Sequence, residues 1–265
     1  MKFSEHIKPQ LIGILNVTPD SFSDGGDFAD HEAALLQAEK LNKEGAVIID
    51  IGGDSTRPGS VCTGVEEEWR RIGPLIARIS RFSIVSVDTH HAEVAEKAIK
   101  EGASIINDVS SGYDPKMFET VAASSAKIIL TYTRCPKPHD FSQTSKGDII
   151  ENIKKYFQQV TVKAKLAGIS NERIILDPGM GAFLSDQAQQ SWNLLARLRE
   201  LENLGYPLAL GISRKGFLKT QINDSNEHRD MKSAMIAGLI LNLGMNKAIA
   251  YLRVHNAAMH RQFIT

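Results

Sequence analysis

The chain has 265 residues and a mass of 29.1 kDa, and its 31 lysine and arginine residues balance its 31 aspartate and glutamate residues. This zero net charge argues against a protein that coats nucleic acid or an anionic membrane, because such proteins usually carry a basic excess. Two cysteines are too few for a disulfide scaffold, the start of the chain lacks a secretion signal, and the most apolar stretch (234–245) is too short to span a bilayer, so the composition predicts a cytoplasmic protein.

Short apolar, β-branched runs alternate along the chain with segments of helical period. The runs predict strands buried on both faces at residues 11–16, 47–51, 83–87, 104–108, 127–132, 173–177, 208–212 and 248–254. The segments of helical period include 30–42, with Asp30 as its expected N-cap, 65–79, 186–204 and 232–243. This alternation predicts a single (β/α)8 TIM barrel domain over residues 1–265. A doubly wound open sheet is the alternative, because periodicity does not show whether a sheet closes.

Polar or glycine-rich groups follow nearly every predicted strand. Some of the aspartates are explained by capping of the next helix, and single basic residues by exposure on the surface. In a parallel barrel, however, the carboxyl ends of all strands meet on the face where active sites are built. The convergence of these groups therefore favours a functional site on that face.

The expected site has two chemically different halves. Cationic and neutral donors suited to a phosphate or pyrophosphate come from Asn16, Arg57, Ser213, Lys215, Arg253 and His255. Asn16 also offers a neutral oxygen ligand for Mg²⁺, whose other ligands would be water and substrate phosphate. Acceptor-rich groups suited to a heterocycle with amino and ring N–H donors come from Asp88, Asn107 and Asp177.

The remaining histidines and the cysteines give no comparable signal. We expect surface positions for His6, His31, His139, His228 and His260. Cys62 and Cys135 lack further thiolates or a histidine pair at zinc-binding spacing, so a metal–thiolate site is not expected.

Seven motifs in chain order carry a family resemblance. They are GILNVTPDSFSDGG (13–26), DIGGDSTRPGS (50–60), SVDTH (86–90), INDVSSG (106–112), LDPGMG (176–181), SRKGF (213–217) and RVH (253–255). With these motifs the chain resembles the dihydropteroate synthases of the pterin-binding barrel family. The resemblance implies a (β/α)8 barrel, often a homodimer, that joins p-aminobenzoate to 6-hydroxymethyl-7,8-dihydropterin pyrophosphate in folate biosynthesis.

The resemblance also implies a role for each matching residue. The pterin would be held by Asp88, Asn107, Asp177 and Lys215, and the pyrophosphate by Asn16, Arg253 and His255, with Mg²⁺ at Asn16. The p-aminobenzoate would contact Thr56, Arg57 and Ser213. Asp88, Asp177, Lys215 and Arg253 would be the catalytic residues. No nucleic-acid or membrane partner is implied.

Two segments and two single positions depart from the family pattern. Ala182, Phe183 and Leu184 stand where the family usually has Phe, Gly and Lys, so an aromatic shelf at position 182 is missing or rebuilt from Phe183. The MGAFLS stretch (180–185) is similar to the corresponding stretch of sulfonamide-insensitive synthases. Residues 132–136 differ from the family's usual His-Met-Gln-Gly, and Asp54 and Asn256 stand where Glu and Asp are common.

Two other functions are alternatives. The departures support the first, a pterin-binding paralogue with lost or altered turnover. A methyltransferase that moves a methyl group from methyltetrahydrofolate to a corrinoid is the other, although it would not need the basic residues Arg57, Lys215 and Arg253.

Overall fold

The strands form a closed barrel. The computed structural model describes residues 8–18, 26–55, 59–135, 137–143, 146–219, 224–244 and 247–264. The strands, all parallel and in sequence order, are β1 (Gln10–Asn16), β2 (Ala46–Gly52), β3 (Ile84–Asp88), β4 (Ile105–Asp108), β5 (Lys127–Thr131), β6 (Ile174–Asp177), β7 (Leu208–Leu210) and β8 (Ile249–Val254). Strand β8 pairs back onto β1, with Arg253 opposite Ile12. This closure confirms the TIM barrel and excludes the open sheet.

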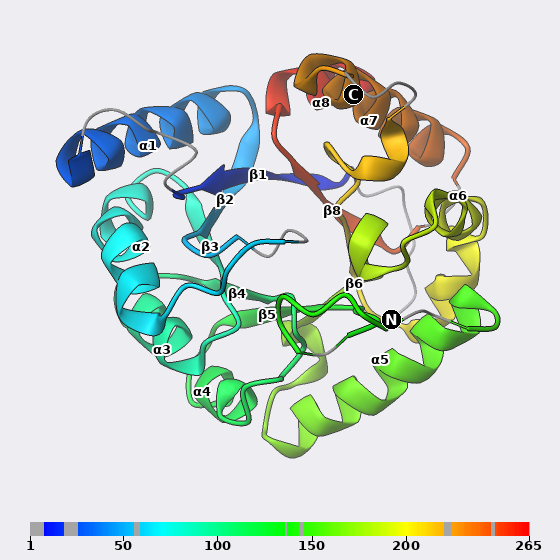
Figure 1. Ribbon diagram of the computed structural model, residues 1–265, viewed down its shortest axis with the longest axis horizontal. Helices are drawn as coiled ribbons and strands as arrows, with labels where there is room; N and C mark the ends of the chain where they lie inside the picture. Colours follow the sequence, from blue (N-terminus) through cyan, green and yellow to red (C-terminus); the bar gives the residue numbers. More distant parts are fainter. Residues whose placement is uncertain are drawn as a thin grey trace.

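Helices surround the barrel on its outer side (Figure 1). They are α1 (Gly26–Lys43), α2 (Val65–Ile79), α3 (Ala92–Lys100), α4 (Met117–Ala122), α5 (Ile149–Leu166), α6 (Ala188–Ala196), α7 (Asn226–Asn242) and α8 (Ala257–Phe263). Short 3₁₀ turns are η2 (Asn171–Arg173), η3 (Gly181–Phe183), η4 (Leu198–Leu204) and η5 (Gly216–Leu218). In the described ranges, no helix is long and apolar enough to cross a bilayer.

Three helix boundaries differ from the sequence-based prediction. Helix α1 begins at Gly26, so Asp30 lies inside the helix and is not its N-cap. The predicted 186–204 helix is broken at Arg197, whose φ of −114° and ψ of 16° are not helical, so α6 is followed by the separate turn η4. Helix α7 begins six residues early because the Ser225 hydroxyl caps it, accepting a hydrogen bond from the His228 backbone N–H.

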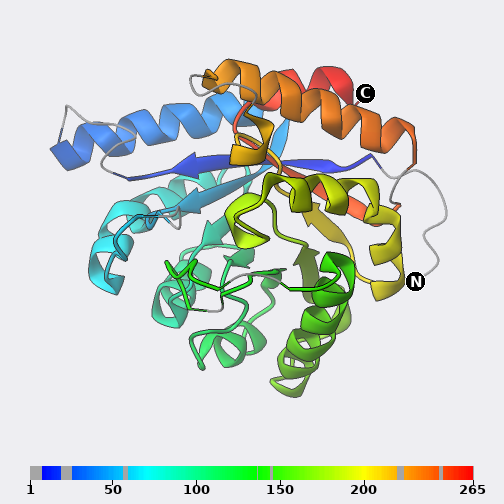
Figure 2. The same ribbon diagram turned by 45° about the vertical axis from the view of Figure 1, so that its right-hand side comes forward.

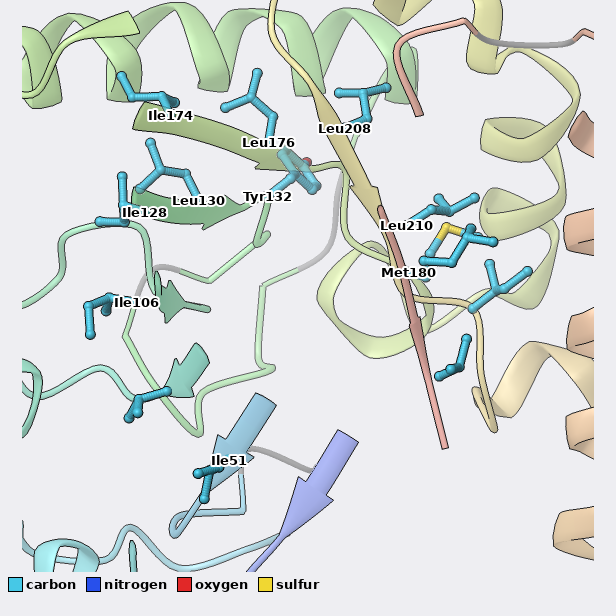
Figure 3. Close-up of a cluster of buried hydrophobic side chains, with 14 of the residues drawn as sticks. Ile51, Ile106, Ile128, Leu130, Tyr132, Ile174, Leu176, Met180, Leu208 and Leu210 are labelled. Atoms are coloured by element: carbon cyan, nitrogen blue, oxygen red, sulfur yellow. The ribbon is translucent and has the colours of Figure 1, made fainter. Parts of the chain in front are cut away.

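The barrel has two apolar cores, because successive strand residues point to opposite faces. The larger core lies between strands and helices, where Ile128, Leu130, Ile174 and Leu176 lie on the outer side of their strands (Figure 3). The smaller core fills the barrel and comprises Ile12, Ile48, Ile105, Ile129, Ile175 and Ala209, with Tyr251 packed against it. Burial on both faces explains why the strands read as continuous apolar runs.

On most strands, the residue two positions C-terminal to this inner layer also points into the barrel, and it is polar. Ile48, Ile105, Ile175 and Tyr251 are followed at this spacing by Asp50, Asn107, Asp177 and Arg253. The period-2 alternation directs these side chains into the mouth of the barrel. The fold thus places a polar layer directly above an apolar plug.

Candidate active site

A cavity of about 800 Å³ opens at the carboxyl ends of the strands. Of the predicted site residues, Asn16, Asp88, Ser213, Lys215, Arg253 and His255 line it. Asn107 and Asp177 are buried beside it: Asn107 pairs with Asp88 in the strand register, and Asp177 lies next to Gly211, which does line the cavity. Thr56 and Arg57 lie outside the described residues, so the structure does not place them.

Arg253 connects two carboxylates at the base of the cavity. Its Nη2 donates to Asp50 Oδ2 and, at 3.0 Å, to Asp88 Oδ2. The Asp50 side chain is fully buried and also accepts from Ser86 Oγ at 2.5 Å and from Asn107 Nδ2 at 3.1 Å. Asp50 therefore holds both Arg253 and Asn107 in place, a role that was not predicted from the sequence.

Several buried polar atoms at this level have no hydrogen-bond partner among the described residues. They are Asn107 Oδ1, Thr131 Oγ1 and Arg253 Nε. Most buried polar atoms in proteins are paired, and those that are not call for an explanation such as a ligand. The Asn107 amide is already oriented by its bond to Asp50, which leaves its oxygen to accept from a bound molecule.

Burial changes the protonation of the two inward aspartates. Burial, opposed by Arg253 and assisted by the nearby Asp50 carboxylate, raises the pKa of Asp88 to about 7. Burial also raises the pKa of Asp177, against the favourable charge of Arg253 and the Gly179 N–H bond to Oδ1 at 2.9 Å. Both groups therefore gain from a ligand that donates hydrogen bonds, because such donors stabilise the ionised carboxylate.

A basic edge formed by the loop after β7 faces these carboxylates. Ser213 Oγ lies 3.0 Å from His255 Nδ1 and accepts from the His255 backbone N–H, which fixes the end of β8 to this loop. Arg214 has a positive φ of 57° and is held by two bonds to Asp230, at 2.9 and 2.7 Å. The next residue, Lys215, extends over the Phe183 ring with Nζ 4.9 Å from its centroid.

An aromatic wall completes the cavity on the side of β5 and β6. Phe183 and Phe141 both line it and meet edge to face at 6.0 Å between ring centroids. Ala182 also lines the cavity. Phe183 thus supplies an aromatic surface beside the small residue at position 182.

Two of the histidines expected at the surface lie elsewhere. His260 is 1% exposed and bonds to Ser233 Oγ, because α8 packs against α7. His139 contacts Asp54 in a cluster with Cys62 and His90. His228 is exposed as predicted, His31 is half-buried, and His6 lies outside the described residues.

Comparison with known proteins agrees with this geometry. The sequence pattern of the family described as pterin binding enzyme matches residues 12–255. A dihydropteroate synthase of Staphylococcus haemolyticus is 38% identical over 255 residues, covering 96% of this chain and 91% of that protein.

Solved structures of such enzymes are also similar. Dihydropteroate synthase of Xanthomonas albilineans with 4-aminobenzoic acid has a TM-score of 0.87 and 34% identity, covering 97% of this chain and 91% of that one. The enzyme of Anaplasma phagocytophilum with 6-hydroxymethylpterin-monophosphate has a TM-score of 0.85 and 35% identity, covering 97% of both chains. The chain therefore belongs to the pterin-binding enzyme family, in its dihydropteroate synthase group of folate-biosynthesis transferases.

Proposed function

We propose that the cavity at the barrel mouth joins 6-hydroxymethyl-7,8-dihydropterin pyrophosphate to p-aminobenzoate, giving 7,8-dihydropteroate and pyrophosphate. One observation carries this proposal: in a single cavity, buried hydrogen-bond acceptors lie on one side and the basic edge lies on the other. Such a cavity suits a substrate with a donor-rich heterocycle at one end and an anion at the other. The similar Xanthomonas and Anaplasma enzymes bind 4-aminobenzoic acid and a pterin monophosphate, which supports the same pair of substrates here.

The pterin is assigned to the acceptor half. Asp177 and Asp88 accept from its amino and ring N–H groups, and Asn107 Oδ1 accepts one further donor. Lys215 lies over the pterin from the basic edge, where Phe183 already contacts its ammonium group. Charge-assisted bonds of this kind are about twice as strong as neutral ones, so the carboxylates carry most of the pterin's binding energy.

The pyrophosphate is assigned to Asn16, Arg253 and His255, which line the same cavity. The Asn16 amide oxygen is a hard neutral ligand, so it suits Mg²⁺ whose remaining ligands are water and pyrophosphate oxygens. When bound there, the ion would neutralise negative charge on the leaving group. Arg253 provides the fixed positive charge of the protein beside it, at the base of the cavity.

The p-aminobenzoate is assigned to Ser213, which lines the cavity together with the aromatic wall of Phe183. Thr56 and Arg57, which lie outside the described residues, are assigned to it from the sequence. Ala182 leaves more space on this wall than the phenylalanine common in the family would. The likeness of residues 180–185 to sulfonamide-insensitive enzymes remains a prediction.

The chemistry needs no protein nucleophile. The pterin methylene C–O bond breaks, and its electron pair leaves with pyrophosphate, whose charge the basic residues stabilise. The carboxylates of Asp88 and Asp177 stabilise the positive charge left on the pterin. The neutral amine of p-aminobenzoate then forms the new C–N bond and releases its proton to pyrophosphate or solvent.

Purified protein incubated with both substrates and Mg²⁺ tests this assignment. Equal amounts of dihydropteroate and pyrophosphate are expected, and omission of p-aminobenzoate should abolish dihydropteroate formation. Tight binding of the pterin substrate without product would instead indicate a paralogue without turnover. Methyl transfer to a corrinoid would indicate the methyltransferase, which the basic edge disfavours.

Pterin binding should weaken below neutral pH, since Asp88 must be ionised to accept from the ligand and its pKa is about 7. Affinity for 6-hydroxymethylpterin, a probe without phosphate, should be constant above this pKa and fall about tenfold per pH unit well below it. Calorimetry at several pH values measures this profile. Asp88→Asn should bind weakly at every pH and should lose the decline that is centred near pH 7, whereas a decline caused by Asp177, whose pKa burial also raises, should persist. A profile with the same midpoint and steepness in this variant would exclude Asp88 as a source.

We further propose a homodimer formed through α7. Helix α7 lies on the outside of the barrel (Figure 2). Met231, Met235 and Leu239 of this helix and its C-cap Leu243, four residues apart, are 45–62% exposed and form the α7 stripe. Exposed apolar stripes of this kind mark protein interfaces, and homodimer interfaces are especially apolar.

We also propose a cytoplasmic location. The unpaired cysteines Cys62 and Cys135 and the folate-pathway function support it.

Charges in the α7 stripe should separate the subunits. Met235→Glu combined with Leu239→Glu is expected to convert a dimer to a monomer, because two buried carboxylates would face each other at the interface. Light scattering measures the mass in solution. Leu166→Glu is the matched control, since Leu166 is 83% exposed on α5, away from the stripe, and an unchanged mass in both variants would argue against this interface.

A further inference from the structure

Four potential metal ligands meet at the rim of the barrel, separate from the proposed Mg²⁺ ligand Asn16. Asp54 and Cys62 come from the loop after β2, His90 follows β3, and His139 belongs to the loop after β5. One donor atom from each side chain lies within 4.8 Å of the other three. Three loops distant in sequence thus bring a carboxylate, a thiol and two imidazoles together.

The distances within this cluster approach those of a metal site. Asp54 Oδ2 lies 2.9 Å from His139 Nε2 and 3.8 Å from His90 Nδ1, and Cys62 Sγ lies 3.8 Å from His90 Nε2. Ligands about 2.0–2.3 Å from a tetrahedral ion are about 3.3–3.8 Å apart, by geometry. The two His90 distances involve different ring nitrogens, so only one of them is a distance between ligands of the same ion. One donor atom of each side chain still lies within 4.8 Å of the other three, and a movement of about 1 Å would bring all four donors around one ion.

His139 is oriented as metal-bound histidines are. Its Nδ1 lies 3.0 Å from Ser60 Oγ, and the single hydrogen of this hydroxyl is donated to the Ser55 carbonyl. With Nδ1–H as the donor to Ser60, Nε2 faces Asp54 Oδ2. A nitrogen lone pair faces a carboxylate oxygen at 2.9 Å only with a proton or a cation between them.

The surroundings of the cluster favour a cation. Asp54 is 2% exposed at its side chain, and the Thr63 N–H donates to its Oδ1, so Oδ2 is directed at the histidines. Glu68, fully buried nearby, accepts from His91, but its Oε1 has no partner among the described residues.

We propose that Asp54, Cys62, His90 and His139 form a binding site for a transition-metal ion of the zinc class. A thiolate, two imidazoles and a carboxylate match the ligand preferences of Zn²⁺, whereas Mg²⁺ prefers oxygen ligands alone. The ion would tie the loops after β2, β3 and β5 to one another at the edge of the cavity, which Asp54 also lines. The sequence spacing of these residues gave no such signal, because their convergence depends on the tertiary fold.

Metal binding by the full chain tests this site directly. Chelator-treated protein is titrated with Co²⁺, and thiolate-to-cobalt charge-transfer absorption is measured. Zn²⁺ affinity is then measured by competition with a chromophoric chelator. One equivalent of tightly bound metal and a single-thiolate absorption band are expected. Cys62→Ser should remove the band, and both Cys62→Ser and His139→Gln should weaken Zn²⁺ binding by more than about 100-fold.

Matched substitutions separate the site from general effects. Cys135→Ala and His228→Gln alter the other cysteine and an exposed histidine, and both should leave metal binding unchanged. His139→Cys keeps a ligand and should retain binding while strengthening the thiolate band, which a purely structural role would not do. Absence of the band in the unaltered protein, or its persistence in Cys62→Ser, would overturn the proposal. Neither readout involves turnover, so the result is independent of the proposed synthase activity.

Discussion

Replacing Arg253 by methionine is expected to abolish synthase activity and to destabilise the barrel. The guanidinium is almost buried and pairs with both Asp50 and Asp88, so its removal leaves two carboxylates without their cation. Loss of one partner from a buried ion pair typically costs about 3–5 kcal/mol in the free energy of unfolding. Loss of the positive charge that faces the pyrophosphate should remove activity through a separate effect on the leaving group.

The destabilisation should depend on pH. Arg253 lowers the pKa of Asp88, so that pKa rises in the Arg253→Met variant. A carboxyl whose pKa is raised by folding binds its proton more tightly in the folded state, and stability is then lost as pH rises through that pKa. Urea unfolding should therefore show a larger deficit at pH 8 than at pH 5.

Two further variants identify the cause. Arg70→Met removes an exposed guanidinium that pairs with Glu67 and should change stability by no more than about 1 kcal/mol. The double variant Asp50→Asn/Arg253→Met should recover part of the stability and none of the activity. Equal stability of Arg253→Met and the unaltered protein at pH 8 would contradict the described ion-pair network.

The barrel was predictable because its signal is local and repeated. Each β run is apolar on both faces, and regular βα spacing implies parallel strands. The polar residues were also found, because they end a predicted strand, as Asp177 does, or directly follow one, as Asp88 does. Their chemistry then pointed to a site with an acceptor half and a basic half.

Contacts made across the barrel were not predictable in this way. Asp50 is inside a strand, and its bonds to Asn107 and Arg253 span 57 and 203 residues of sequence. His139 and Asp54 are 85 residues apart, in loops whose positions depend on the packing of several helices. His260 is polar and near the end of the chain, but the packing of α8 on α7 buries it.

Asp177→Asn should separate catalysis from stability. The amide keeps the shape of the carboxylate and an oxygen to accept from the Gly179 N–H, so the local fold should persist. It loses the negative charge that accepts from the pterin and stabilises the developing cation. We expect kcat/KM to fall about 100- to 1000-fold, as when a group that stabilises transition-state charge is removed.

Although kcat/KM falls in Asp177→Asn, the free energy of unfolding at pH 8 should not fall with it and is expected to rise. Burial raises the pKa of Asp177, which means that the ionised carboxylate is less favourable in the folded protein than in water. A neutral side chain removes this penalty, so Asp177→Asn should be at least as stable as the unaltered protein. Functional residues characteristically reduce stability in this way, whereas a residue that supports the fold would lower both quantities when replaced.

Asp186→Asn is the matched control for this prediction. Asp186 also lines the cavity, but its side chain is 60% exposed and pairs with Arg134 at the rim. Its neutralisation should change kcat/KM by less than about fivefold, since exposed charges interact weakly in water. Steady-state kinetics and urea unfolding of both variants measure the contrast. Similar kinetic losses in the two would mean that general charge around the cavity, and not the inward position of Asp177, determines the rate.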